Sequence, residues 1–246
     1  MNIKRQIRKR ACLIITMFAI SCFLFAQPGM PGMTGRTSPV VNPDLTVTFN
    51  LFAPTVSEVL LRFEGDTAKY PMKKDEKGRW TVTVGPLKPR IYTYALHVDG
   101  LRILDPLNPE LQTGTVPGYN LLNVPADPPR FDEIRDVPHG SVHIRTYYST
   151  VQKKLRKLYV YVPPEYDLSY DRKYPVLYLR HGGGGNETSW YNEGAAGIIM
   201  DNLLAEGKAR PMIIVMTNGN VETGVPGGYN NEALQVGADE LFTDVL

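Results

Sequence analysis

Residues 174–185 read Tyr-Pro-Val-Leu-Tyr-Leu-Arg-His-Gly-Gly-Gly-Gly, an apolar run followed by arginine, histidine and four glycines. A short apolar run without alternation is typical of a strand whose sheet is covered on both faces. We therefore expect a buried strand at 174–179. Glycines at the carboxyl end of such a strand let backbone N–H groups face a cavity, because no side chains stand in the way.

Such N–H donors can bind a phosphate or the oxyanion of an acyl-transfer reaction. A phosphate loop needs Lys and then Ser or Thr after its glycines, whereas Asn186 and Glu187 follow here. A dinucleotide fingerprint would need its last glycine at the position of Glu187. Histidine followed by glycines after an early strand is similar to the oxyanion motif of α/β-hydrolases. The oxyanion interpretation is favoured, and a plain flexible turn stays open as the alternative.

The flanking sequence predicts alternating strands and helices, which indicate a parallel α/β sheet. The helix expected at 195–205 has its apolar periodicity in Ile198, Ile199, Leu203 and Leu204, and it ends at Gly207. The other elements expected in this half are paired strands at 143–148 and 156–162, a buried strand at 211–216 and a helix at 232–246.

The first half has the pattern of an all-β module. Residues 45–52 alternate, with Leu45, Val47, Phe49 and Leu51 on one face. Further strands are predicted at 56–63, 80–84, 91–98 and 101–104, separated by turn residues. Short strands at this spacing favour a β-sandwich. Its aromatic residues Trp80, Tyr92 and Tyr94 are expected in the core or at an interface rather than on a sugar-binding surface.

The N-terminus has a basic segment and an apolar run that ends at Ala26, typical of a signal peptide at 1–26. An uncleaved anchor is the alternative. Cleavage would remove five of the 27 basic residues, leaving 22 against 25 acidic ones, or a net charge of about −3. It would also remove both cysteines, Cys12 and Cys22, and with them any disulfide or thiolate zinc site. We expect a periplasmic or extracellular protein that binds no nucleic acid and, after cleavage, no membrane.

Residues 138–246 resemble the feruloyl and acetyl-xylan esterase family, which includes esterase D and enterochelin-esterase-like proteins. The resemblance rests on Leu158-Tyr-Val-Tyr-Val-Pro-Pro-Glu-Tyr166, on residues 173–184, on Glu187-Thr-Ser-Trp190 and on residues 202–219. It implies the first part of a three-layer α/β-hydrolase domain. It also implies a Ser, Asp or Glu, and His triad, no cofactor, and an oxyanion N–H on Gly183 or Gly184.

One departure from the family concerns the nucleophile. None of the seven serines lies in a Gly-x-Ser-x-Gly motif, and Ser189 matches a family position that is not the nucleophile. None of the four histidines is expected to act as a triad base. We therefore predict that no catalytic triad residue is present, that the chain is C-terminally truncated, and that it is inactive as given.

Two further predictions concern ligands near the glycines. Trp190 and Tyr191 are predicted to contact substrate by lining an acyl or sugar pocket, with cover for the sheet edge as an equal alternative. His139 and His143 have the i, i+4 spacing of a helical metal pair, but Pro138 and Gly140 disfavour a helix there, so no metal site is expected.

A second resemblance covers the N-terminal module. Arg90-Ile-Tyr-Thr-Tyr-Ala-Leu-His-Val-Asp-Gly and Asp105-Pro-Leu-Asn-Pro109 resemble the early-set immunoglobulin-like domain that precedes the catalytic domains of isoamylases and branching enzymes. Asp105 itself is expected to form a turn. The predicted organisation is a signal peptide at 1–26, a flexible leader at 27–43, this sandwich at 44–124, a proline- and charge-rich linker at 125–138 and the hydrolase part at 139–246.

The function implied is that of an exported carbohydrate esterase that removes feruloyl or acetyl groups from polysaccharide. Its partners would be a polysaccharide or a small ester. One alternative is a glycan-binding β-sandwich with an inert hydrolase remnant. The other is a gene fragment with no separate function.

Overall fold

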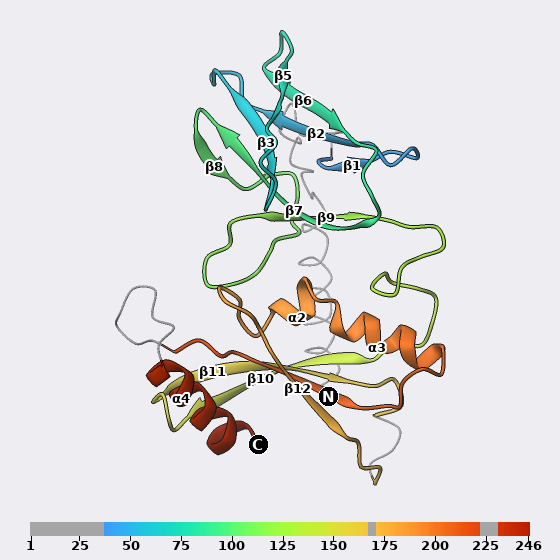
Figure 1. Ribbon diagram of the computed structural model, residues 1–246, viewed down its shortest axis with the longest axis vertical. Coiled ribbons are helices and arrows are strands. Elements are labelled where there is room, and N and C mark those ends of the chain that lie inside the picture. The colour runs from blue at the N-terminus through green and yellow to red at the C-terminus, as the bar shows by residue number, and fades with distance from the viewer. Residues whose placement is uncertain (1–36, 167–170, 222–230) are drawn as a thin grey trace, which may run out of the picture. The chain divides into compact units, whose positions relative to one another are not determined.

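The computed structural model describes residues 37–166, 171–221 and 231–246 (Figure 1). The predicted signal peptide and most of the predicted leader lie outside these residues. Thr37–Leu246 clusters as one compact unit, with an all-β part first and an α/β part after it. No helix within the described ranges combines the length and apolarity that crossing a membrane requires.

The all-β part consists of two antiparallel sheets. The first has the order β1 (Val40–Val41), β2 (Val47–Phe52), β6 (Arg79–Val84) and β5 (Lys73–Lys74). The second has the order β4 (Tyr70–Pro71), β3 (Val59–Phe63), β7 (Arg90–Val98) and β8 (Leu101–Ile103), with β9 (Asn120–Val124) also paired to β7.

One core joins these sheets, and alternation along the strands creates it. Val47, Phe49 and Leu51 of β2 are buried, as predicted, while the residues between them are not. The Phe49 ring meets Tyr94 of β7 edge-on at 4.8 Å between centroids. Tyr94 is fully buried and Trp80 nearly so, which confirms the prediction that these aromatics belong to the core.

The sandwich begins earlier than predicted. Val40 and Val41 pair with β2, and Ser38 is buried, so the end of the expected flexible leader is part of the sheet. The reason is tertiary, because the Ser38 hydroxyl donates to Asp105 Oδ2 at 2.6 Å. Asp105 also forms the predicted turn, since its Oδ1 accepts the Leu107 N–H at 2.9 Å.

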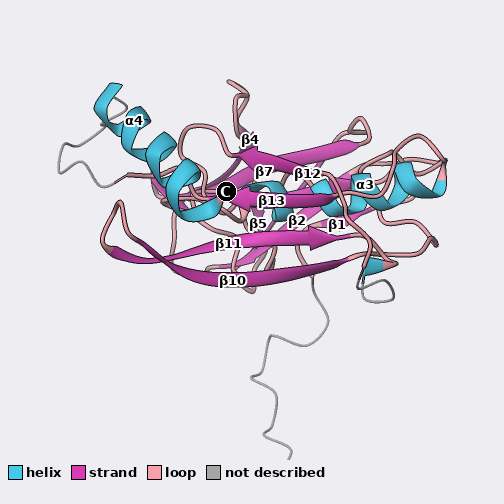
Figure 2. Cartoon of the chain, turned by 90° about the horizontal axis from the view of Figure 1, so that it is seen from below, coloured by secondary structure: helices cyan, strands magenta, loops and turns pink. Residues whose placement is uncertain are grey.

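The α/β part is built on a mixed sheet with the order β10 (Ser141–Ser149), β11 (Lys154–Val162), β13 (Ile213–Thr217) and β12 (Val176–Arg180). β10 and β11 form a long antiparallel hairpin, β11 and β13 are antiparallel, and β12 and β13 are parallel (Figure 2). The helices are α2 (Ser189–Asn192), α3 (Ala196–Ala205) and α4 (Asn231–Glu240), which continues into a π-helical segment, η2 (Leu241–Val245).

Two predictions about burial are wrong. β12 was expected to be covered on both faces, yet Val176, Leu177 and Tyr178 are about 40% exposed. Among the described residues β12 pairs only with β13, so it lies at the edge of the sheet. The buried strand is β13 instead, as predicted.

In α3 the fully buried side chains are Met200, Asp201 and Asn202 rather than the predicted isoleucines and leucines. The polar pair is buried because it binds the preceding segment. Asn202 donates to the carbonyls of Phe131 and Glu133, both at 2.8 Å. The proline- and charge-rich stretch at 125–138 is therefore fixed to the α/β part by hydrogen bonds.

Candidate functional site

The glycine loop, residues 182–185, follows β12, and residues 218–220 follow β13. The carboxyl ends of parallel strands meet at one edge of a sheet, where ligands commonly bind. The two loops are joined there: the Asn220 side-chain amide donates to the Gly185 carbonyl at 2.7 Å. Strand pairing therefore places the glycine loop beside a second polar loop.

The backbone of the glycine loop is tightly turned and open. The Gly185 N–H donates to the Gly182 carbonyl at 3.2 Å, and Gly184 has φ +79°, a conformation that favours glycine. A Cβ added at Gly182, Gly183 or Gly184 would meet no atom within 4 Å. Within the described residues, neither the Gly183 nor the Gly184 N–H donates a hydrogen bond. These are the two donors that the sequence predicted for an oxyanion.

His181 holds this loop in place through both ring nitrogens. Nε2 accepts the Gly219 N–H at 2.8 Å, so Nδ1 carries the proton and donates to the Gly182 carbonyl at 2.7 Å. A neutral imidazole used at both nitrogens has none left for a nucleophile. His181 is thus a positioning residue, consistent with the expectation that it is not a triad base.

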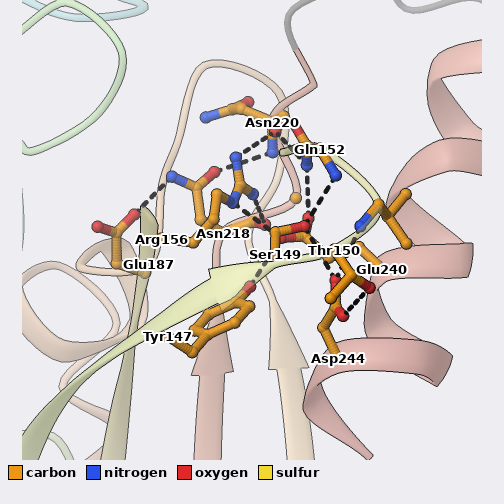
Figure 3. A network of polar contacts seen from close by, with 12 residues as sticks. Tyr147, Ser149, Thr150, Gln152, Arg156, Glu187, Asn218, Asn220, Glu240 and Asp244 are labelled. Carbon is orange, nitrogen blue, oxygen red and sulfur yellow. Dashed lines mark hydrogen bonds and ion pairs between the residues drawn. The ribbon is translucent and has the colours of Figure 1, made fainter. Parts of the chain in front are cut away.

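A buried ion pair supports the second loop from below (Figure 3). Arg156 of β11 donates to the carbonyls of Asn220 at 2.8 Å and Asn218 at 2.5 Å. Its Nε lies 3.0 Å from Glu240 Oε1, and both side chains are at most 6% exposed. The Asn218 side chain donates to Glu187 at 2.6 Å, beyond the glycines. Helix α4 is thereby connected to the glycine loop through β11 and residues 218–220.

The same network fastens α4 and η2 to the β10–β11 hairpin. The Tyr147 hydroxyl donates to Glu240 at 2.8 Å, and burial with this carboxylate raises the pKa of Tyr147 to about 12. Ser149 and Thr150 donate to Asp244 at 3.0 and 2.6 Å (Figure 3). The end of the chain thus contributes acceptors that fix the loops of the site.

A cavity of about 400 Å³ opens in front of the glycine loop. Residues from both parts of the chain line it. From the α/β part these are Gly182, Gly183, Gly184, Gly185, Ser189 and Glu193, and from the all-β part Glu64, Arg102, Gln112, Thr113, Gly114, Val116, Gly118 and Tyr119. The undonated N–H groups therefore border a cavity large enough for a small organic group.

Segment 112–115 of the all-β part makes the wall facing the glycines. The Thr115 N–H donates to the Gly184 carbonyl at 2.9 Å. A Cβ on Gly114 would lie 2.4 Å from that carbonyl oxygen, so this close approach requires glycine. The Thr113 N–H donates to Glu193 at 2.6 Å, and burial raises the pKa of this carboxyl.

The predicted substrate contacts, Trp190 and Tyr191, do not line this cavity. Trp190 Nε1 donates to the Arg180 carbonyl at 3.0 Å, at the end of the edge strand β12. The Tyr191 ring lies 5.5 Å from that of Tyr159. Their positions match the alternative role as cover for the sheet edge, and substrate contact stays a prediction.

The remaining histidines are placed elsewhere. His139 Nδ1 lies 2.9 Å from Asp201 Oδ2, and Nε2 lies 3.0 Å from the Arg135 carbonyl. His143 Nε2 lies 3.3 Å from the Ser141 hydroxyl on β10, a pair that the sequence analysis did not anticipate. In the described structure no carboxylate contacts the His143 ring and neither residue lines the cavity, so the pair lacks the arrangement of a triad.

Sequence reasoning missed the cavity residues of the all-β part, Arg102, Gln112, Thr113 and Tyr119. They carry no local motif, and only the fold brings them to the glycines. The short helix α2 was also missed, because four residues are too few for a periodic pattern.

The arrangement of strands, glycine loop and cavity is that of an acyl-transfer protein, and comparison identifies the class. Residues 149–245 match the model of the Esterase family, and the chain belongs to this family.

An endo-1,4-beta-xylanase/feruloyl esterase of Xylanibacter ruminicola is 35% identical over 228 residues, 89% of this chain and 31% of the relative. The chain thus spans about a third of that relative's length. The enterochelin esterase of Shigella flexneri superposes with a TM-score of 0.55 over 85% of this chain and 60% of its own, at 15% identity, which shows a common fold. A ferulic acid esterase of Anaeromyces mucronatus, solved with ferulic acid, is 31% identical over 46% of this chain and 43% of its own, with a TM-score of 0.41.

Proposed function

We propose that this chain forms the oxyanion-binding part of a carbohydrate esterase, a carboxylic ester hydrolase that removes feruloyl or acetyl groups from polysaccharide. The observation that carries the proposal is that the Gly183 and Gly184 N–H groups have no acceptor in the described structure and border the cavity. The match to a feruloyl esterase at 35% identity supports the ester class.

The chemistry follows from these donors. Attack on an ester carbonyl places negative charge on the carbonyl oxygen, and N–H groups already aimed at that oxygen stabilise the charge without reorganising. One such donor is worth roughly 2.7–4 kcal/mol of barrier. His181 and the Asn220 side chain contribute by fixing the loop that carries the donors. The printed sequence contains no Gly-x-Ser-x-Gly, so we expect this chain to bind acyl groups without turning them over.

The remaining predictions of domain type and location belong to the same proposal. The two antiparallel sheets with one core support an early-set immunoglobulin-like module at the front. The basic and then apolar N-terminus supports export, since an enzyme that acts on insoluble polysaccharide must meet it outside the cytoplasm.

Binding at the glycine loop is tested by titrating the ¹⁵N-glycine-labelled chain with ferulate, whose carboxylate presents anionic oxygens. The Gly183 and Gly184 amide signals are expected to shift in NMR spectra. Gly183→Pro removes one donor and should abolish the shift of Gly184. Gly183→Ala keeps the N–H and meets open space, so it is the matched control and should respond like the unaltered chain.

Two results would contradict the proposal. One is a titration in which neither amide responds. The other is a Gly183→Pro variant that binds as well as Gly183→Ala. Release of ferulate from methyl ferulate by this chain would overturn the expectation that binding occurs without hydrolysis.

A further inference from the structure

The outer face of the second β-sheet carries a group of basic side chains. In the antiparallel register His97 of β7 lies opposite Leu60 of β3 on one side and Arg102 of β8 on the other. Arg62 lies opposite Ala95, two residues along the same face. Directly opposite residues share a face of a sheet, so these side chains project together, away from the core that Leu61 and Leu96 fill.

Nearby charges confirm this grouping. Burial is the first cause that lowers the pKa of His97, and Arg62, Arg102 and Lys69 lower it further because they are close enough to disfavour an imidazolium. We call Arg62, Lys69, His97 and Arg102 the basic face. Such a concentration of cations is notable in a chain whose net charge would be about −3 after signal removal.

The three cations of the basic face have no anionic partner. Within the described part of the chain, Arg62, Lys69 and Arg102 form no ion pair, whereas Arg130, Arg135 and Arg156 each pair with a carboxylate. Arg102 is nevertheless oriented: its guanidinium lies 5.0 Å from the centre of the Tyr119 ring, and Nη1 donates to the Tyr119 hydroxyl at 3.1 Å. An oriented guanidinium without a carboxylate is suited to an anion from outside.

The basic face is continuous with the cavity of the candidate site. Arg102 and Tyr119 line the same cavity as Gly183 and Gly184. The carboxylate beside them, Glu64, accepts hydrogen bonds from Thr93 at 2.8 Å and Gln112 at 3.3 Å, so its charge is already partly compensated. A chain molecule that enters the cavity with one residue would therefore pass over the basic face with its neighbours.

We propose that the basic face binds an acidic polysaccharide, with uronate carboxylates of the sugar chain paired to Arg102 and Arg62. The proposal rests on the proposed function, which supplies the acylated sugar in the cavity. Uronate is the anion of choice because it is the acidic group that polysaccharide substituents commonly carry, and a planar carboxylate matches the planar guanidinium in two parallel hydrogen bonds. The selection would be for esters that lie near uronate side groups.

The test measures retention of the full chain in gels that contain glucuronoxylan, and in gels that contain the same polymer after reduction of its carboxyl groups. We expect roughly tenfold weaker retention by the reduced polymer, the effect of losing one charge-assisted contact. Arg62→Gln/Arg102→Gln should lose about the same factor on glucuronoxylan and nothing on the reduced polymer. Lys73→Gln/Lys77→Gln removes equal charge from exposed positions away from this sheet and should change retention less than twofold.

Three outcomes would overturn the inference: equal retention by both polymers, equal loss in the lysine control, or equal retention by dextran sulfate, which is anionic but has no uronate. Circular dichroism of each variant verifies the fold. Gly183→Pro separates this inference from the proposed function, since it should abolish the ferulate response and leave retention intact. Retention lost from the unaltered chain while ferulate still binds would refute the basic face alone.

Discussion

At the scale of single residues, two histidines show how hydrogen-bond partners decide chemistry. His181 has an N–H donor facing one nitrogen and a carbonyl facing the other, so it is neutral and holds the glycine loop. His139 has acceptors facing both nitrogens, the Asp201 carboxylate and the Arg135 carbonyl. Two acceptors favour the doubly protonated ring, because only imidazolium donates from both nitrogens.

His139 therefore makes stability depend on pH. The hydrogen bond to Asp201, first among the causes, raises the pKa of His139 above its usual 6.5. A folded pKa above the unfolded one stabilises the fold fully below about pH 6.5, and this contribution is lost as pH rises through the folded pKa. The free energy of urea unfolding, measured between about pH 5.5 and 8.5, should fall over this range more for the unaltered chain than for His139→Ala.

Parallel pH profiles of the two proteins would show that the pair is not coupled to folding. An NMR titration of the His139 ring gives the pKa directly and serves as the control for the unfolding data. The change in stability should be modest, because the His139 side chain is 38% exposed.

At the scale of elements, the links between strands and helices are polar and buried. Arg156 on β11 and Glu240 at the end of α4 form an ion pair at 3.0 Å, with Tyr147 and Gln152 also bound to the carboxylate. A buried pair of this kind is expensive to break, because the remaining charge is left without compensation.

Glu240→Gln is therefore expected to destabilise the α/β part by about 3–5 kcal/mol, the cost of an uncompensated buried guanidinium. The measurement is the free energy of unfolding in urea. Glu232→Gln, at an exposed position in the first turn of the same helix, is the matched control and should change this energy by less than about 0.5 kcal/mol. Equal effects at the two positions would mean that the buried pair contributes no more than a surface charge.

β12 shows the limit of pattern reasoning at this scale. Its apolar run is the same whether neighbours cover it or not, so the sequence predicted burial. In the structure it is the edge strand, and Val176, Leu177 and Tyr178 are partly exposed. Burial is a property of the neighbours rather than of the strand.

At the scale of the whole molecule, the all-β and α/β parts are joined around Thr113. Its N–H and hydroxyl both donate to Glu193, and its hydroxyl also accepts from Thr188 at 2.6 Å. Thr115 adds a backbone bond to Gly184. The cavity exists because these contacts hold a loop of one part against the glycines of the other.

Glu193→Ala should loosen this junction, since it removes the acceptor for two donors of Thr113. We expect a loss of about 1–3 kcal/mol, the cost of partly buried donors left without partners. Calorimetry should then resolve two unfolding transitions where the unaltered chain shows one. Glu187→Ala removes a carboxylate from the same loop without touching Thr113, and it should leave a single transition. One transition in both variants would show that the parts unfold together without this contact.

Much of this protein was determined by its sequence alone. The alternation of β2, the turn at Asp105, the end of α3 near Gly207 and the glycine loop were predicted correctly, because each depends on neighbours within a few residues. The family could be predicted for the same reason, since its motifs are local.

Only the tertiary structure decided the rest. It placed Ser38 in the sandwich, buried Asp201 and Asn202 in α3, exposed β12, and brought Arg102 and Tyr119 to the cavity of Gly183 and Gly184. These features depend on residues that are tens of positions apart, and no local pattern contains the information about which of them meet. The glycine loop itself was evident from the sequence, whereas the wall that faces it exists only in the folded chain.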